Sequence, residues 1–297
     1  MNMLIEINSL QKHFNIPVLS GVNFTLLEGQ TVGLIGENGA GKTTLIKIIL
    51  GFLNPTSGTV RVFGKKPGRT FEIGYLPEKP DYHLLFSGQE YLGWLARLSG
   101  MSGRKMQNRI GDVLDLVGMQ GRANQRMSKY SKGMLQRIGV AQAMLGDPSL
   151  VILDEPLSGL DPSGQKDLRD IIVELQKREK SILLCSHLLN EVERVCTDIA
   201  IIHKGKIIHS GNMKSVLIEQ NNYQLGLENM SSSVYNRLVS DFKIKQIDPN
   251  NLLYTEGFGG EKEVLLGKLL ENRVIINELK PVKRSLEDFF MTNTRGK

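Results

Sequence analysis

A glycine-rich segment near the start of the chain, residues 36–43, limits the possible folds more than any other feature. It reads Gly-Glu-Asn-Gly-Ala-Gly-Lys-Thr and matches the pattern G-x-x-x-x-G-K-[ST]. A short apolar run, residues 31–35, precedes it, and residues 45–49 after it carry leucine and isoleucine at helical spacing. A strand, a glycine-rich loop and a helix in this order predict a phosphate-binding loop, and this context argues against a chance match.

The residue types of this loop suit a nucleotide such as ATP. Glycines allow the backbone to fold tightly, so that consecutive N–H groups point at phosphate, and a helix that begins near Gly41 adds its positive end. We expect Lys42 to reach the β- and γ-phosphates, Thr43 to ligate Mg²⁺ and Thr44 to bond the α-phosphate. The predicted nucleotide-binding residues of this loop are Gly36, Asn38, Gly39, Ala40, Gly41, Lys42, Thr43 and Thr44.

Two adjacent acids, Asp154 and Glu155, end another apolar run at residues 150–153. Paired carboxylates are usually a solvated face. At the carboxyl end of a parallel strand, however, they lie where α/β sheets bind ligands. We expect Asp154 to hold Mg²⁺ through water and Glu155 to polarise the water that attacks the γ-phosphate, because phosphoryl transfer needs mainly positioning and charge neutralisation.

The chain has 297 residues, enough for one large core and a smaller appended domain. Continuous apolar runs separated by helical patterns predict a doubly wound α/β core over residues 1–214. A capping box at residues 87–90 opens a mostly helical insert over about residues 87–146. Asp161 followed by proline marks the start of a later helix.

The pattern changes after Gly211, where the apolar runs become weaker. From Tyr223 the order reads strand, helix, strand, strand, helix, strand and helix. Residues 231–233 cap a helix, residues 274–276 form a short strand, and residues 285–291 form a terminal helix. Residues 215–297 are therefore predicted to be a small accessory α+β domain.

The segment Tyr-Ser-Lys-Gly-Met-Leu-Gln-Arg, residues 130–137, narrows the choice among proteins with a phosphate-binding loop. It precedes the paired acids and resembles the signature motif, Leu-Ser-Gly-Gly-Gln, of the ABC ATPase family. The resemblance covers residues 4–211 with the main motifs in order. It implies a P-loop NTPase fold whose core carries an antiparallel β subdomain and a helical subdomain.

Further roles follow from this resemblance position by position. Phe14 matches the aromatic residue that stacks on adenine, which is favoured here over the alternative that its side chain is part of a core. Residues 75–78 match the Q-loop, and residues 158–161 match the D-loop, which ends in Asp161. His187 matches the switch histidine that contacts the γ-phosphate, so the resemblance implies catalytic roles for Glu155 and His187.

The chain departs from the family pattern at three positions. Glu78 replaces the usual Q-loop glutamine, and a carboxylate there can still hold Mg²⁺ or bond its hydration shell. Lys132 and Met134 replace the first glycine and the glutamine of the signature, whereas Ser131 and Gly133 are retained. The resemblance therefore implies that this altered signature still faces the ATP bound by another subunit.

The family pattern implies two kinds of protein partner. Two ATP molecules would join the chain to a second copy of itself or to a homologous ATPase subunit. Membrane-spanning permease subunits would dock near Glu78, on residues 84–86 and 91–98, although Trp94 and its neighbouring leucines can equally be core. Residues 89–101 and 285–290 resemble the exporter branch that handles antibiotics, drugs, lipids or peptides. The expected location is the cytoplasmic face of the cell membrane.

The composition and the absence of certain motifs limit which other functions the chain could have. No apolar stretch approaches the roughly 20 residues of a membrane span, and Cys185 and Cys196 are expected to be buried free thiols. The net charge of +6 includes no long basic run, so no nucleic acid is expected. An Asn-Lys-x-Asp motif of GTPases is absent. An ABC ATPase acting on ribosomes or DNA and an importer subunit remain as alternatives, whereas Lys42, Asp154, Glu155 and His187 together argue against a non-catalytic regulatory module.

Overall fold

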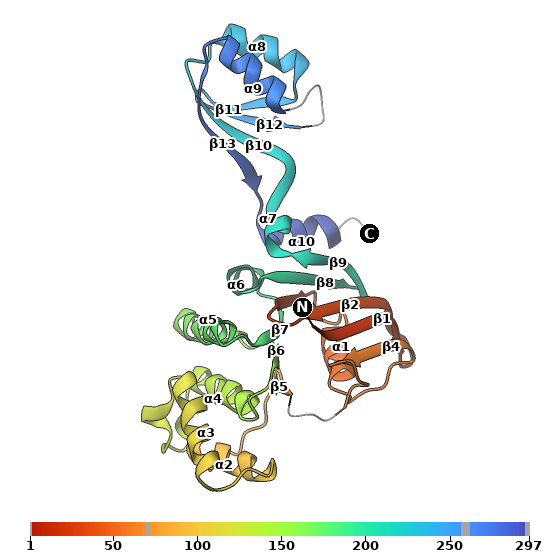
Figure 1. Ribbon diagram of the computed structural model, residues 1–297, viewed down its shortest axis with the longest axis vertical. Coiled ribbons are helices and arrows are strands. Elements are labelled where there is room, and N and C mark those ends of the chain that lie inside the picture. The colour runs from red at the N-terminus through yellow and green to blue at the C-terminus, as the bar shows by residue number, and fades with distance from the viewer. Residues whose placement is uncertain (1, 69–71, 257–261, 295–297) are drawn as a thin grey trace. The chain divides into compact units, whose positions relative to one another are not determined.

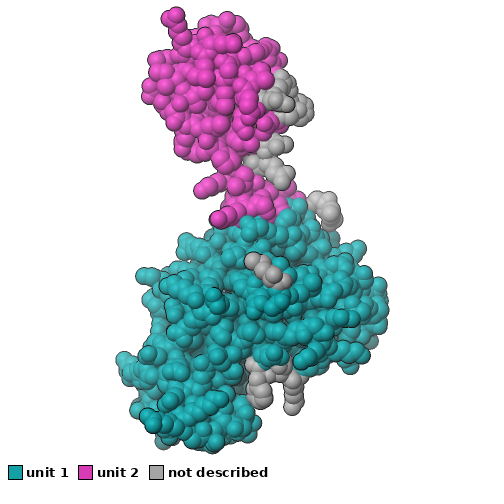
Figure 2. All heavy atoms as spheres, in the orientation of Figure 1, with its two compact units in different colours: residues 1–213, 293–297 teal, residues 214–292 magenta. Residues whose placement is uncertain are grey.

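The structure is a computed structural model that describes residues 2–68, 72–256 and 262–294. The chain divides into two compact units, residues 1–213 with residues 293–297 and residues 214–292 (Figure 2). Among the residues described, no helix is both long and apolar enough to cross a membrane.

A six-stranded sheet forms the centre of the larger unit (Figure 1). Its first five strands are parallel, and the last returns antiparallel to its neighbour. In spatial order the strands are β5 (Ile73–Leu76), β6 (Leu150–Asp154), β7 (Ser181–Ser186), β3 (Thr31–Ile35), β8 (Asp198–His203) and β9 (Lys206–Asn212). Every residue of β3, β6 and β7 is buried, which is why these strands read as continuous apolar runs. Their carboxyl ends lie side by side at one edge of the sheet.

Helices lie on both sides of this sheet, so the core is doubly wound as predicted (Figure 1). On one side α1 (Lys42–Ile49) packs over Leu34. On the other side lie α5 (Pro162–Lys177) and α6 (Leu189–Val195). Gly33 allows α6 to approach closely, because a Cβ atom at this residue would lie 2.3 Å from Cγ1 of Val192. Cys185 and Cys196 are buried and free, as expected.

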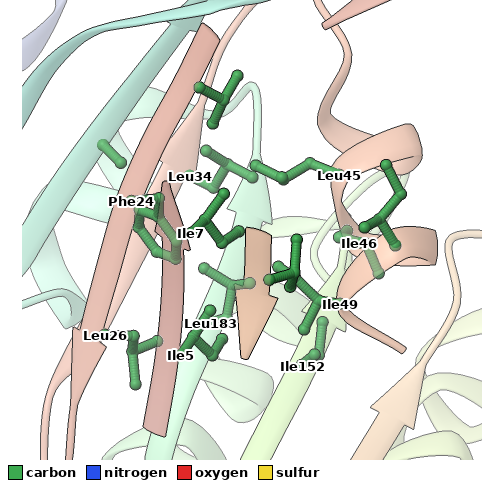
Figure 3. Packing of buried hydrophobic residues seen from close by; sticks show 14 of the residues in the cluster. Ile5, Ile7, Phe24, Leu26, Leu34, Leu45, Ile46, Ile49, Ile152 and Leu183 are labelled. Carbon is green, nitrogen blue, oxygen red and sulfur yellow. The ribbon is translucent and has the colours of Figure 1, made fainter. Parts of the chain in front are cut away.

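A second sheet, antiparallel and three-stranded, covers the outer side of α1. Its order is β2 (Pro17–Leu27), β1 (Met3–His13) and β4 (Ser57–Val62). Figure 3 shows how its inward side chains meet those of α1 and of the central sheet. The labelled core residues include Ile5, Phe24, Leu45, Ile49 and Leu183. This apolar sandwich fixes α1, and hence the loop that precedes it, against the carboxyl edge of the central sheet.

The region after β5 is mostly helical, as the sequence predicted. It contains α2 (Gly88–Leu98), α3 (Gly103–Leu116), two short 3₁₀ turns, η1 (Gln120–Arg122) and η2 (Met127–Lys129), and α4 (Lys132–Met144). The capping box before α2 is present, since the Glu90 amide donates to Ser87 Oγ and the Ser87 amide donates to Glu90 Oε2. An ion pair between Arg137 and Asp167 connects α4 to α5. This ion pair ties the helical region to the core.

The smaller unit is a four-stranded antiparallel sheet with two helices packed on one face. Its elements are β10 (Ile218–Glu228), α8 (Ser232–Asp241), β11 (Ile244–Asp248), β12 (Asn251–Thr255), α9 (Lys262–Glu271) and β13 (Ile275–Lys283), flanked by α7 (Met213–Leu217) and α10 (Leu286–Thr294). The order of strands in the sheet is β11-β12-β10-β13. A βαββαβ chain with this arrangement is a ferredoxin-like fold.

The predicted order of elements after Tyr223 is correct, but two strands are longer than the sequence indicated. β10 begins at Ile218, and β13 continues to Lys283 rather than ending at Ile276. The added part of β13, residues 277–283, is mostly polar and exposed, and among the described residues it pairs with β10 alone at the edge of the sheet. Apolar periodicity therefore could not reveal it, whereas backbone pairing with β10 holds it extended.

Candidate functional site

The loop between β3 and α1 depends on glycine at three positions. Gly39 and Gly41 have φ of 80° and 110°, a region that side chains with a Cβ atom rarely adopt. A Cβ atom at Gly41 would lie 2.7 Å from Leu19 Cδ2, and one at Gly36 would lie 2.3 Å from the Ile202 carbonyl oxygen. The glycines of the motif thus let the backbone curl at the start of α1 without a clash.

The loop forms the floor of a cavity of about 510 Å³ at the carboxyl edge of the central sheet. Lys42 is only 7 % exposed although it is charged. Its Nζ atom donates to the carbonyl oxygen of Gly36 at 2.6 Å and of Glu37 at 3.2 Å. The ammonium group is thereby held over the loop, where it faces the cavity. The predicted residues that line the cavity are Asn38, Gly39, Gly41, Lys42, Thr43, Thr44, Glu78, Asp154, Glu155 and His187.

Asp154 ends β6 inside this cavity and is almost completely buried. Its Oδ1 atom has no hydrogen-bond partner among the described residues. Burial, followed by the carboxylates of Glu155 and Glu78, raises the pKa of Asp154 to about 6, and the Lys42 ammonium offsets only part of this rise. A buried carboxylate oxygen without a partner is costly unless a ligand completes it.

The donor set around Asp154 fits a magnesium ion. Carboxylate oxygens of Asp154 and Glu78 and the hydroxyl of Thr43 all line the cavity. Hard divalent cations prefer such oxygen ligands, and a cation would satisfy the unpartnered Oδ1 atom and lower the repulsion among the acids.

Glu155 adopts a strained backbone conformation that places its side chain between two other groups of the site. Its φ of 51° is unusual for a residue with a Cβ atom. Its amide donates to the Cys185 carbonyl oxygen at 2.9 Å, which ties it to β7. Oε1 lies 3.9 Å from Lys42 Nζ, and Oε2 lies 2.7 Å from His187 Nδ1. A cation, a carboxylate and an imidazole therefore converge on one side of the cavity.

Phe14 lies at the tip of the hairpin between β1 and β2 and does not line this cavity. Its side chain is 56 % exposed, which excludes the alternative that it is a core residue. Lys12 Nζ lies 4.8 Å from the centre of the ring. One face of the aromatic ring therefore carries a cation.

The predicted signature residues and Asp161 also lie outside the cavity lining. Ser131 is the N-cap of α4, where its Oγ atom accepts from the Met134 amide at 3.3 Å. The ammonium of Lys132 lies against Gly159, since a Cβ atom at Gly159 would meet it at 2.2 Å. Asp161 caps α5 through a bond from the Gly164 amide, as its sequence position predicted. The four signature positions are Ser131, Lys132, Gly133 and Met134.

Three lining residues were absent from the sequence-based set: Val18, Glu37 and Ser158. Glu37 lies in the glycine-rich segment 36–43, and Ser158 lies in the segment 158–161 that matches the D-loop. The sequence motifs therefore already pointed to both positions. Val18 lies near the start of β2 and belongs to no motif. Only the packing of β2 beside the loop brings it to the cavity.

The sheet order and the glycine-rich loop define a P-loop NTPase fold, and comparison with known proteins narrows the class. Residues 19–158 match the ABC transporter family. An uncharacterized ABC transporter ATP-binding protein of Nostoc sp. (strain PCC 7120) is 37 % identical over 281 residues, which cover 92 % of this chain and 82 % of the relative. The chain belongs to the family of ABC transporter ATP-binding proteins, and it is an ATPase subunit of this family.

Relatives with assigned names and solved structures agree with this family. The bacitracin transport ATP-binding protein of Bacillus licheniformis is 31 % identical, and the match covers 98 % of this chain and 97 % of that protein. A solved structure of an ATP-binding subunit of an ABC transporter is 31 % identical and covers 72 % of this chain and 91 % of its own, with a TM-score of 0.63. The cbiO1 protein of Clostridium perfringens, part of the ABC transporter complex cbiONQ, is 25 % identical over 73 % of this chain and 91 % of its own, with a TM-score of 0.68.

Proposed function

We propose that the cavity binds ATP with Mg²⁺ and hydrolyses the γ-phosphate. The observation that supports this most directly is the buried Oδ1 atom of Asp154, which has no hydrogen-bond partner in the described part of the chain and lies beside a buried lysine and a glycine-rich loop. Thr43, Glu78 and Asp154 would hold the magnesium ion, which neutralises phosphate charge when bound. Lys42 would exchange its bonds to the Gly36 and Glu37 carbonyls for bonds to phosphate oxygens.

Glu155 is proposed to orient and deprotonate the attacking water. A carboxylate can only accept, so the Nδ1 atom of His187 carries the proton in their 2.7 Å contact. The Nδ1–H bond to Glu155 fixes the orientation of the imidazole ring. Nε2 would donate to the γ-phosphate when the ring carries a proton on each nitrogen. His187 would therefore orient the base and sense the phosphate at the same time.

ATP is proposed to join the chain to a second copy of itself or to a homologous subunit. In support, Ser131, Lys132, Gly133 and Met134 do not line the cavity of their own chain. The amide groups at the start of α4 and the Ser131 hydroxyl can donate to the γ-phosphate held by the other subunit. We assign residues 1–214 as the ATPase domain, with its helical subdomain at about 87–146, and residues 215–297 as an accessory domain.

Membrane-spanning permease subunits are the proposed second partner, which would hold the chain at the cytoplasmic face of the membrane. Leu85 is 80 % exposed and Leu84 is also exposed, next to a cluster in which Trp94 contacts His83 and Phe86. Exposed adjacent leucines beside aromatic rings form a surface suited to an apolar partner segment. Because a relative of nearly equal length is named for bacitracin transport, we propose export of an antibiotic-like or lipid-like compound.

The ATPase proposal is tested by comparing two lysines of the same helix. Lys42→Met should weaken binding of ATP with magnesium by about ten-fold or more, because charge-assisted hydrogen bonds are lost. Lys47→Met, at an exposed position in the last turn of α1, should weaken ATP binding far less than Lys42→Met, because Lys47 does not line the cavity. Titration calorimetry measures both affinities. Equal affinities for the two variants would contradict the assigned site.

A further inference from the structure

The hairpin that carries Phe14 is anchored to the segment that follows α1. Lys12 Nζ donates to the Asn54 carbonyl oxygen at 2.9 Å. The His13 amide donates to Thr56 Oγ1 at 3.0 Å, and the Thr56 amide donates to the Gln11 carbonyl oxygen at 2.8 Å. Because α1 begins at the phosphate-binding loop, these three bonds couple the hairpin tip to the helix that carries that loop.

Lys12 also contacts the ring of Phe14 directly. Its ammonium lies 4.8 Å from the ring centre, within the distance at which a cation is attracted to an aromatic face. Lys12 is half-buried and forms no ion pair with a described residue, so the Asn54 carbonyl and the ring are the contacts that define its position. Phe14, by contrast, is more than half exposed and has little packing of its own.

We propose that Lys12 is a positioning residue for the nucleotide base: it holds one face of the Phe14 ring and leaves the opposite face for adenine. This inference rests on the proposed ATP binding and, within it, on the stacking of Phe14 on adenine that the family resemblance implies. The bond to Asn54 fixes the ammonium, and the ammonium in turn restricts the ring, so less side-chain freedom is lost when the base binds. A cation on one face also draws electron density from the ring, which reduces its repulsion with the π-system of a base on the other face.

The role of Lys12 predicts an effect on ligands that carry a base and none on ligands that lack one. The probes are MgADP and magnesium pyrophosphate, which are both bound without hydrolysis, and calorimetry gives each dissociation constant. Lys12→Met keeps the aliphatic stem but removes the charge, and it should weaken MgADP binding by roughly two- to five-fold. Binding of magnesium pyrophosphate should not change. Lys12→Arg, which keeps a cation and a donor, should restore MgADP binding.

The Phe14→Ala background separates this inference from the function on which it rests. In that background Lys12→Met should have no further effect on MgADP, because the ring that it positions is absent. An unchanged or tighter MgADP affinity in Lys12→Met, an equal loss for pyrophosphate, or the same loss without Phe14 would each overturn the role of Lys12. If Phe14→Ala itself left MgADP binding unchanged, the proposed stacking of Phe14 would fail, and this inference would fail with it.

A third variant, Lys12→Gln, tests whether the loss in Lys12→Met comes from the missing charge or from the missing hydrogen bond to Asn54. It keeps an N–H donor on a slightly shorter side chain but carries no charge, so it should weaken MgADP binding as Lys12→Met does. Thermal melting of each variant shows whether the hairpin remains folded. Wild-type MgADP affinity in a folded Lys12→Gln variant would show that the hydrogen bond, and not the cation over the ring, positions Phe14, which contradicts the proposal.

Discussion

The Nδ1 atom of His187 lies 2.7 Å from Oε2 of Glu155, although the two residues are 32 positions apart in the chain. The sheet explains their proximity. β6 ends just before Glu155 and β7 ends just before His187, and these parallel strands are direct neighbours in which Asp154 pairs with Cys185. Two side chains that leave adjacent strands at the same edge must meet above that edge.

Glu155→Gln should leave ATP binding intact but reduce hydrolysis by about a hundred-fold or more, because the amide cannot take a proton from water. The variant should accumulate as an ATP-bound dimer, which is visible by size-exclusion chromatography with light scattering. Phosphate release measures the loss of turnover.

Glu179→Gln is a matched control for this prediction. Glu179 also has a positive φ, of 58°, but it is exposed and lies outside the cavity lining. The same chemical change at this position should leave hydrolysis unaltered. Wild-type turnover in Glu155→Gln would remove Glu155 from its proposed role.

Asp154→Asn should abolish hydrolysis and yet stabilise the nucleotide-free protein at pH 7.5. Burial raises the pKa of this carboxyl to about 6, so the native state binds its proton more tightly than the unfolded chain does. The stability that the protonated group contributes is present below pH 4 and is lost as the pH rises through about 6. Removing the charge should therefore raise the free energy of unfolding of the nucleotide-free protein by about 1–3 kcal/mol at pH 7.5.

The pH dependence of this gain provides the control. The difference in melting temperature between Asp154→Asn and the unchanged protein, measured without nucleotide or magnesium, should shrink as the pH falls from 7.5 to 5. A difference that is independent of pH would mean that the gain comes from packing and not from the charge. Lower stability of Asp154→Asn at pH 7.5 would contradict the expected cost of the buried carboxylate.

Ser131→Ala should reduce hydrolysis by about ten-fold or more without weakening nucleotide binding to the single subunit, because its hydroxyl is proposed to act on the ATP of the partner. Ser131 is also an N-cap, and losing the cap costs about 1 kcal/mol of stability. Ser231→Ala removes an equivalent cap from α8 and should not affect hydrolysis. Weaker MgADP binding in Ser131→Ala would contradict a site completed in trans.

Leu85→Asp should weaken association with the permease subunits while leaving the hydrolysis of the isolated chain unchanged, because a charge would be placed at the centre of the proposed apolar contact. Leu270→Asp changes another exposed leucine, on α9, and is the control. Co-purification of the tagged chain with detergent-solubilised permease subunits measures the effect. Equal recovery of permease with both variants would place the contact elsewhere.

The sequence by itself determined the elements whose signals are local. The glycine-rich loop, the apolar runs of β3, β6 and β7, the caps at Ser87 and Asp161 and the order of elements after Tyr223 were all readable, because each depends on neighbouring residues or on a short periodicity. The candidate phosphate and magnesium residues followed from the same local motifs together with the strand that precedes the acids.

Only the tertiary structure decided which distant groups meet. The contact of His187 with Glu155, the strand order of the ferredoxin-like unit, the full length of β13 and the bond from Lys12 to the Asn54 carbonyl each join segments whose relative positions no local pattern specifies. Strand order and register are set by packing and backbone pairing between residues far apart in the chain. Exposure of an aromatic ring such as Phe14 likewise depends on whether a neighbouring element covers it, which is a property of the assembled fold.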